Sequence, residues 1–137
     1  MISYTTEVKD LTEDQLDGFF AGWPRSPSFQ QFHAALHGSY RALVATDEHT
    51  GSVVGFITAI SDGTLTAFIP WLEVLPTYQG HGIGSELLDR MLTELGTLYS
   101  VDLTCEENLT EFYVHRGMIP LRGMATRNPA ALANPAG

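Results

Sequence analysis

The sequence predicts an α/β domain in which helices flank one central mixed sheet, partly antiparallel and partly parallel. First, apolar residues recur at helical spacing in two stretches, Ser28–Gly38 and Ser85–Gly96. Second, three runs with strand composition lie between these stretches and are joined by short turns, so neighbouring strands must run antiparallel. Third, a strand–helix–strand–helix order from Leu65 onward adds a parallel pair to the sheet.

Two helices are expected before the sheet. The first begins at the capping box Thr12–Gln15, in which the side chains at both ends can cap the helix start. The second begins at Ser28, with Gln31 as its capping partner, and stops at Gly38. Its apolar stripe consists of Phe29, Phe32 and Leu36.

The next segments predict an antiparallel meander. The strands Tyr40–Thr46 and Ser52–Ile60 are joined by a short turn, and a further turn at Ser61–Gly63 leads into a third strand, Leu65–Leu75. Pro70 lies inside this third strand. Because proline has no N–H to donate, it predicts a bulge or a break in pairing there.

The rest of the chain returns to helices and short strands. A helix from Ser85 ends at Gly96, and Asn108 with Glu111 is expected to cap a later helix that Gly117 closes. The expected elements are the strand Tyr99–Cys105, the helix Leu109–Arg116, and one or two short strands in Met118–Arg127. We expect residues 1–127 to form a single domain and 128–137 a flexible tail rich in Pro and Ala.

Composition narrows the class of protein. The 137 residues are 44% hydrophobic and 17% charged, which supports a packed core and argues against disorder. The formal net charge of −9 disfavours binding to nucleic acid or to an acidic membrane surface. No apolar run is long enough for a membrane helix, no signal peptide is visible, and the single cysteine excludes an intrachain disulfide. We therefore expect a cytoplasmic protein.

Residues 72–85 carry the most informative motif, a strand followed by a glycine-rich turn and the start of an amphipathic helix. Backbone N–H groups of such a turn, together with the helix dipole, form a pocket for phosphates. A P-loop is excluded because it needs a lysine in the turn, and the only lysine is Lys9. A dinucleotide fingerprint would use Asp102, about twenty residues beyond the glycines, but Pro76 and its neighbours separate Val74 from Gly80, and a meander precedes the turn.

A third interpretation fits the motif. The pattern Gln79-x-x-Gly82-x-Gly84, after a Leu-x-Val-x-Pro strand, resembles the acetyl-CoA-binding motif of the GNAT superfamily of N-acetyltransferases. The segment from Cys105 to Met118, Cys-Glu…Phe-Tyr-x-x-x-Gly-Met, resembles a second motif of that family, in the form found in the branch of serotonin N-acetyltransferase. The resemblance covers about Ala42–Met118 and implies the GNAT fold and acetyl transfer to an amine.

The resemblance also implies roles for particular residues. The turn would hold the pyrophosphate of the co-substrate acetyl-CoA through Gln79, Gly80, His81, Gly82, Ile83, Gly84 and Ser85. The strand backbone at Leu72 and Val74 would bind the pantetheine arm, in a splay between two parallel strands. Tyr113 would lie beside the thioester sulfur as the general acid for the leaving thiolate. The amine would attack the acetyl carbonyl directly, in a ternary complex.

The general base is not supplied by the family pattern. The histidines that act as bases in the serotonin N-acetyltransferase branch match Phe68 and Pro70, which cannot accept a proton. Glu73 and Asp102 are the nearest acidic candidates, and we take Glu73 as the candidate base; a water chain, or an amine that arrives neutral, is the alternative. Glu106 stands where many members carry an asparagine that contacts CoA.

The acceptor side is expected in the N-terminal segment, which walls that side of the cleft in the family. Trp23, Phe29 and Phe32 are candidate acceptor-binding residues, and aromatic faces in an acidic protein favour a small primary amine. The alternative is that these aromatic residues only fill the core. His33 and His37 are four residues apart, but no metal site is expected.

Two further alternatives stay open. A non-catalytic acyl-CoA-binding module would keep the glycine turn without a base. A homodimer is possible, although the sequence names neither the acceptor nor the oligomeric state.

Overall fold

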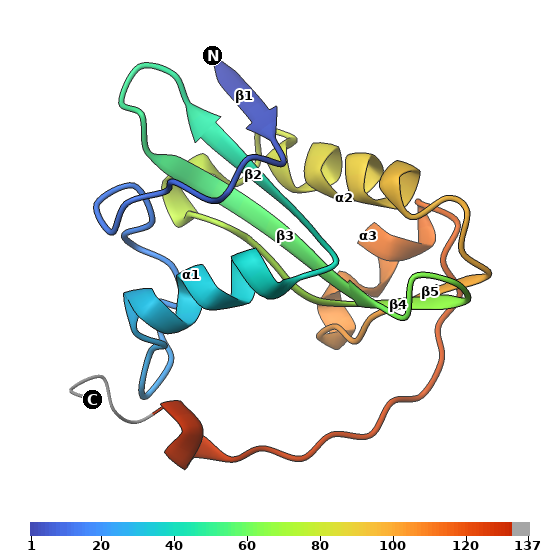
Figure 1. Ribbon diagram of the computed structural model, residues 1–137. Coiled ribbons are helices and arrows are strands. Elements are labelled where there is room, and N and C mark those ends of the chain that lie inside the picture. Colours follow the sequence, from blue (N-terminus) through green and yellow to red (C-terminus); the bar gives the residue numbers. More distant parts are fainter. Residues whose placement is uncertain (133–137) are drawn as a thin grey trace.

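The structure, a computed structural model, is described for residues 1–132. Five strands form one sheet in the order β1-β2-β3-β4-β5. Figure 1 shows α1 on one face of this sheet and α2 on the opposite face. The strands are β1 (Ile2–Thr5), β2 (Arg41–Asp47), β3 (Val53–Ser61), β4 (Thr66–Val74) and β5 (Ser100–Asp102), and the helices are α1 (Phe29–Gly38), α2 (Ile83–Glu94) and α3 (Thr110–Val114).

The sheet is mixed, as predicted. β1 to β4 pair antiparallel with their neighbours, whereas β4 and β5 pair parallel through Thr66–Phe68 and Ser100–Asp102. The predicted irregularity at Pro70 is also present: Thr58 pairs with Trp71 but Ile60 pairs with Phe68, so β4 carries one extra residue across this step. That extra residue is a bulge, which bends the strand and re-aims its side chains.

The two longer helices form for the reasons visible in the sequence. Ser28 caps α1 with a complete capping box, in which its side chain accepts from the Gln31 N–H and the Gln31 side chain accepts from the Ser28 N–H. The apolar side of α2 is fully buried at Leu87, Leu88 and Met91. At roughly 2 kcal/mol for each fully buried side chain of this size, burial rather than helix propensity stabilises α2.

Each face of the sheet has its own apolar core. On the α2 side, Ile57 and Ala59 of β3 pack among the buried residues of the helix. On the α1 side, Phe56 packs against Phe19, Phe20 and Phe32, with ring centroids 4.8–5.9 Å apart. The strand β3 is buried on both faces, which explains its nearly continuous apolar sequence.

The predicted first helix at Thr12 is wrong. The reciprocal hydrogen bonds between Thr12 and Gln15 do form, but the chain continues as turns. Gly18, Phe20 and Gly22 all have positive φ, at 98°, 64° and 88°. Left-handed residues at this spacing cannot continue a right-handed helix. The capping signal was therefore correct locally, and the following backbone conformation overrode it.

Three other expectations need correction. β1 was not predicted, and it pairs with β2 at the sheet edge. Asn108 does not cap α3: a 3₁₀ turn, Glu107–Leu109, precedes the helix, whose first turn has no side-chain cap. Residues 118–127 form no strand. Of the predicted tail, Pro129–Leu132 forms a 3₁₀ turn, and the expectation for 133–137 lies outside the described residues.

Candidate active site

The glycine-rich turn lies where β4 ends and α2 begins. Gly80 and Gly82 have φ values of 82° and 84°, which L side chains rarely adopt, and a Cβ at either position would meet no atom within 4 Å. Gly82 is the N-cap of α2 and supplies no side-chain cap. The first bond within the helix runs from the Glu86 N–H to the Gly82 carbonyl, so the N–H groups of residues 83–85 have no partner inside the helix. An open turn with unpartnered N–H groups is a cradle for an anion.

A cavity of about 350 Å³ opens above this turn. Its walls combine the two motifs that were recognised separately in the sequence. The lining residues are Val74, Tyr78, Gln79, Gly80, Gly82, Ile83, Gly84, Ser85, Leu109 and Phe112. The side chain of Gln79 donates to the Val74 carbonyl at 2.9 Å, which fixes the turn against the end of β4. The tertiary structure thus brings the turn and the α3 region to one site.

The sheet opens beside this cavity. β4 pairs with β5 only as far as Phe68, and its backbone continues to Val74 without a β5 partner. The bulge at Ile69–Pro70 lies at the start of this unpaired stretch. The end of β4–β5 pairing corresponds to the splay between two parallel strands that the family resemblance implies. An extended ligand chain can bind the free backbone groups of β4 there.

Tyr113 lies on the α2 side of the sheet, in α3. Its ring packs against the α2-side core and makes an edge-to-face contact with Phe112, at a centroid distance of 4.9 Å. Burial raises the pKa of the Tyr113 phenol, and the nearby Cys105 thiol raises it further. The phenol is therefore protonated at neutral pH and is suited to donate a proton. It is not among the residues that line the cavity at the glycine turn.

Glu73 lies on the other face of β4, toward α1. Its Oε2 accepts a hydrogen bond from the Phe20 backbone N–H at 2.9 Å. Burial raises the pKa of the Glu73 carboxyl, and the bond from Phe20 partly offsets this effect. A carboxylate with a raised pKa is a better proton acceptor than a solvated one. Asp102, the other acidic candidate, is exposed on β5.

The predicted acceptor residues have different environments. Trp23 is half-buried beside Trp71, with ring centroids 5.5 Å apart, and the Phe20 ring contacts both. Phe29 is half-buried against His33. Phe32 is only 6% exposed and belongs to the core, so it offers no surface to a ligand.

Trp71 and Phe20 were not predicted as site residues. Trp71 is 41% exposed and lies two positions before Glu73 on the same strand, so its side chain points to the same face. Because alternate residues of a strand face the same side, its spacing from Glu73 could have identified Trp71 from the sequence. No sequence signal predicted the contact between the Phe20 N–H and Glu73, because it joins a turn to a strand that lies 53 residues away.

The remaining candidates lie outside the cavity. Leu72 packs against the α2-side core, and His81 is exposed with its Nδ1 3.2 Å from the Tyr78 carbonyl oxygen. Cys105 and Glu106 are exposed. Among residues 1–132, no three His, Cys, Asp or Glu side chains are grouped so as to hold a metal ion.

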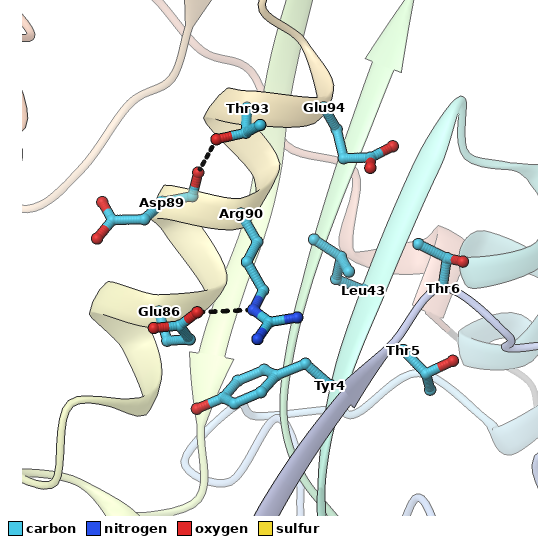
Figure 2. A pocket seen from close by; sticks show the side chains of 9 residues that line it. All are labelled: Tyr4, Thr5, Thr6, Leu43, Glu86, Asp89, Arg90, Thr93 and Glu94. Atoms are coloured by element: carbon cyan, nitrogen blue, oxygen red, sulfur yellow. Dashed lines mark hydrogen bonds and ion pairs between the residues drawn. The ribbon is translucent and has the colours of Figure 1, made fainter.

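A larger surface hollow, of about 530 Å³, lies between β1 and α2 (Figure 2). Its Arg90 is engaged, since it pairs with Glu86 at 2.6 Å and its guanidinium lies 4.6 Å from the centre of the Tyr4 ring. The other charged side chains of its rim are acidic, Asp89 and Glu94. Asp89 and Glu94 pair with Arg116 and Arg41. No cationic side chain that lines this hollow is therefore free to hold an anion, and size alone does not make it the active site.

A mixed sheet that opens between two parallel strands, with an open glycine turn at a helix N-terminus beside the opening, is the arrangement expected of an acyltransferase. Residues 8–118 match the family model described as acetyltransferase (GNAT) family. The chain belongs to this family.

Solved structures and curated relatives that are similar to this chain are also described as acetyltransferases. A putative acetyltransferase from Deinococcus radiodurans has a TM-score of 0.87 and 40% identity, covering 92% of this chain and 87% of that one. A GNAT family acetyltransferase from Streptococcus pneumoniae has a TM-score of 0.75 and 30% identity, covering 93% and 98%. GCN5-related N-acetyltransferase 1, chloroplastic, from Arabidopsis thaliana is 29% identical over 123 residues, which are 87% of this chain and 61% of that protein.

The probable acetyltransferase TAP2 of Glycine max is 31% identical over 107 residues, or 70% of this chain. The chain spans only 43% of that protein and so corresponds to part of it. Within the part of the chain that the structure describes, no helix is both long and apolar enough to cross a membrane.

Proposed function

We propose that this chain transfers the acetyl group of acetyl-CoA to the primary amine of a small molecule, by direct attack in a ternary complex. The observation that carries the proposal is the cavity at the glycine turn, where unpartnered N–H groups of α2 adjoin the unpaired backbone of β4. The turn suits the pyrophosphate, and the free β4 edge suits the amide-bearing pantetheine arm. Because no acidic side chain lines this cavity, the net charge of −9 does not prevent anion binding there.

Acetyl-CoA supplies an activated acetyl thioester. Glu73 is the proposed base that removes a proton from the amine as it attacks, and its raised pKa favours this role. Tyr113 is the proposed acid that donates its phenolic proton to the departing thiolate. The Glu73 side chain projects from β4 toward the α1 side, whereas Tyr113 packs on the α2 side, and β4 has no β5 partner beyond Phe68.

The proposed acceptor site lies on the α1 side of β4. Trp23 and Trp71 both contact the ring of Phe20, and the backbone N–H of Phe20 donates to the half-buried carboxylate of Glu73. Aromatic faces beside a carboxylate attract a small ammonium ion. This ion loses one proton to solvent before attack, and Glu73 takes the second proton as the amine attacks. We propose that Trp23, Trp71 and Phe29 contact the acceptor. Phe32 is left out because it is buried. A cytoplasmic location stays a prediction.

The test is turnover of acetyl-CoA with a panel of small amines, measured as release of the CoA thiol and as mass gain of the amine. We expect acetylated primary amines and no transfer to anionic acceptors such as sugar phosphates. Tight acetyl-CoA binding by calorimetry without turnover on any amine would instead support the non-catalytic acyl-CoA-binding module. Absence of both binding and turnover would contradict the proposal.

A further inference from the structure

We propose that Arg116 is a positioning residue: its guanidinium holds α3, and with it Phe112 and Tyr113, in place against α2. This inference rests on the proposed function, because Tyr113 is the proposed acid and Phe112 is a wall of the proposed acyl-donor cavity. One ion pair, one cation–π contact and the hydrogen bonds that close the chain after α3 support it.

The helix α3 cannot fix its own position. It has only five residues, none of them buried, and no side chain caps its first turn. A helix of this length is not stable by itself in water, so contacts with other elements must set where its side chains lie. Phe112 and Tyr113 are half-buried against the α2-side core. Because apolar packing is non-directional, a polar contact adds the direction that packing lacks.

Arg116 supplies this polar contact between the α3 region and α2. Its Nε lies 3.5 Å from Oδ1 of Asp89, a residue of α2. Of the three ion pairs among residues 1–132, one joins α2 to β2 and one lies within α2, so this pair alone connects α2 to the α3 region. The Arg116 side chain is 24% exposed, against 41% and 48% for the arginines of the other pairs, so water screens its charge less.

The chain after α3 transmits this anchor to both aromatic residues. The Arg116 N–H donates to the Tyr113 carbonyl at 2.9 Å, and the Met118 N–H donates to the same carbonyl at 3.3 Å. The turn is thus closed on the residue that carries the proposed acid. Arg116 also follows Phe112 by four residues, the spacing at which two side chains meet on a helix, and its guanidinium carbon lies 4.9 Å from the centre of the Phe112 ring.

The carboxylate of Asp89 is what offsets the charge of Arg116. The Nε–H of Arg116 is buried and makes no hydrogen bond among the described residues. Asp89 is the only carboxylate of these residues within ion-pair distance of Arg116. Removal of Asp89 therefore leaves a partly buried charge uncompensated and releases Arg116 from α2.

Arg90 has the same two kinds of contact elsewhere on α2. It pairs with Glu86 at 2.6 Å, and its guanidinium carbon lies 4.6 Å from the centre of the Tyr4 ring. Figure 2 shows Arg90 pointing toward β1, whereas Asp89 points away from it. Arg90 does not line the cavity at the glycine turn. The Arg90→Gln variant is therefore the matched control, because it removes an equivalent pair and ring contact without loosening α3.

The first test is steady-state acetyl transfer by the full chain and its variants. Arg116→Gln should raise KM for acetyl-CoA and lower kcat, each by roughly tenfold, because Phe112 and Tyr113 both lose their positions. Arg116→Lys keeps the positive charge and should recover both constants to within a factor of about three. Arg90→Gln should match the wild type. Wild-type constants in Arg116→Gln, or an equal loss in Arg90→Gln, would overturn the proposal.

Asp89→Asn tests whether the anchor on α2 is the cause. It should shift KM and kcat in the same directions as Arg116→Gln. The double variant, Asp89→Asn with Arg116→Gln, should be no worse than Arg116→Gln alone, because two residues that act as a unit are non-additive. Losses that multiply in the double variant would show that the two residues act separately, which contradicts positioning through α2.

The second test needs no turnover, so it decides the matter even where the proposed acetyl transfer fails. The Tyr113 phenol is titrated by NMR in protein with isotope-labelled tyrosine. Burial raises its pKa in the wild type, and the Cys105 thiol raises it further. A freed α3 exposes the ring to water, so the pKa of Tyr113 should fall toward its ordinary value in Arg116→Gln and stay raised in Arg90→Gln.

The direction of this change is decisive. Loss of a nearby positive charge without movement of α3 would raise the pKa of Tyr113, so an unchanged or higher pKa in Arg116→Gln refutes the positioning role. A lower pKa of Tyr113 in Arg116→Gln, with no acetylation of any amine by the wild type, would support the positioning role and reject the proposed function.

Discussion

The carboxylate of Glu73 accepts a 2.9 Å hydrogen bond from the backbone N–H of Phe20, a residue with a φ of 64°. A positive φ is uncommon for a phenylalanine, and the aromatic contacts of Phe20 hold it there. The bond uses one carboxylate oxygen and leaves Oε1 available to a ligand. The carboxylate of Glu73 is thus positioned by the turn around Phe20, which follows the segment where the sequence predicted a first helix.

The first prediction concerns Glu73→Gln. We expect kcat/KM at neutral pH to fall roughly 10²-fold or more, because the base is lost while the Phe20 contact can persist. In the wild-type protein, the pKa that governs the acid limb of the kcat/KM profile should lie above the ordinary range for a glutamate, because burial raises the pKa of Glu73. The variant should lose that limb and keep a later rise as the amine itself deprotonates.

A measurement of stability separates the proposed catalytic role of Glu73 from a merely structural role. A carboxyl with a raised pKa binds its proton more tightly in the folded state, so its ionisation weakens stability as the pH rises through the folded pKa. Glu73→Gln should therefore unfold no more readily than the wild type at neutral pH. Lower activity with an equally lower melting temperature would contradict the catalytic assignment.

The second prediction concerns Tyr113→Phe. Burial and Cys105 raise the pKa of Tyr113, so the phenol stays protonated over the whole neutral range. Loss of the acid should lower kcat by roughly 10²-fold or more while KM for acetyl-CoA changes little. A kcat within a factor of about three of wild type would show that another group protonates the thiolate.

The third prediction concerns the glycine turn. Gly82→Glu should abolish acetyl-CoA binding in calorimetry, because it places a negative charge where an anion approaches the N-terminus of α2. Gly51→Glu is the matched control: Gly51 also has a positive φ, 76°, and open space around its Cβ position, but it lies in the β2–β3 turn. Equal affinity in the two variants would refute the assignment.

The fourth prediction concerns the link between the turn and the β2–β3 hairpin. The Tyr78 hydroxyl donates to Asp47 Oδ2 at 2.5 Å, and this bond, with the His49 N–H, lowers the pKa of Asp47. A lowered carboxyl pKa stabilises the fold above the unfolded pKa, and the effect is lost as the pH falls through the folded value. Tyr78→Phe should lower the melting temperature at pH 7 and converge with wild type in acid.

Tyr99→Phe is the control for this measurement, since Tyr99 is 88% exposed and its hydroxyl has no hydrogen-bond partner among the described residues. Its melting temperature should match wild type at every pH. A Tyr78→Phe deficit that does not change with pH would show that the lost bond does not act through the ionisation of Asp47.

The fifth prediction concerns the acceptor side. Trp71→Ala and Trp23→Ala should each raise KM for the amine by about tenfold, the loss expected when a cation–π contact with a large ring is removed. KM for acetyl-CoA should stay within a factor of about two in both, which serves as the internal control. An unchanged amine KM in both variants would place the acceptor elsewhere.

Local patterns in the sequence were sufficient for much of the fold. The capping box at Ser28, the apolar runs of β2 and β3, and the glycine turn before α2 each depend on neighbouring residues. The irregularity at Pro70 was likewise predictable, because a missing N–H disrupts any ladder. The family motif at Gln79–Gly84 belongs to the same class of local information.

Tertiary structure alone decided the features that depend on distant partners. The same capping signal at Thr12 starts no helix, because the aromatic packing of Phe20 and the positive φ values around it favour turns. The segment 118–127 has the composition of a strand but pairs with none, since a strand needs a partner that local sequence cannot specify. The contact of Glu73 with Phe20 and the grouping of Leu109 and Phe112 with the turn arise in the same way. Helix caps and turns are formed by bonds between near neighbours, whereas strand pairing and site assembly are set by which surfaces the whole chain can bury together.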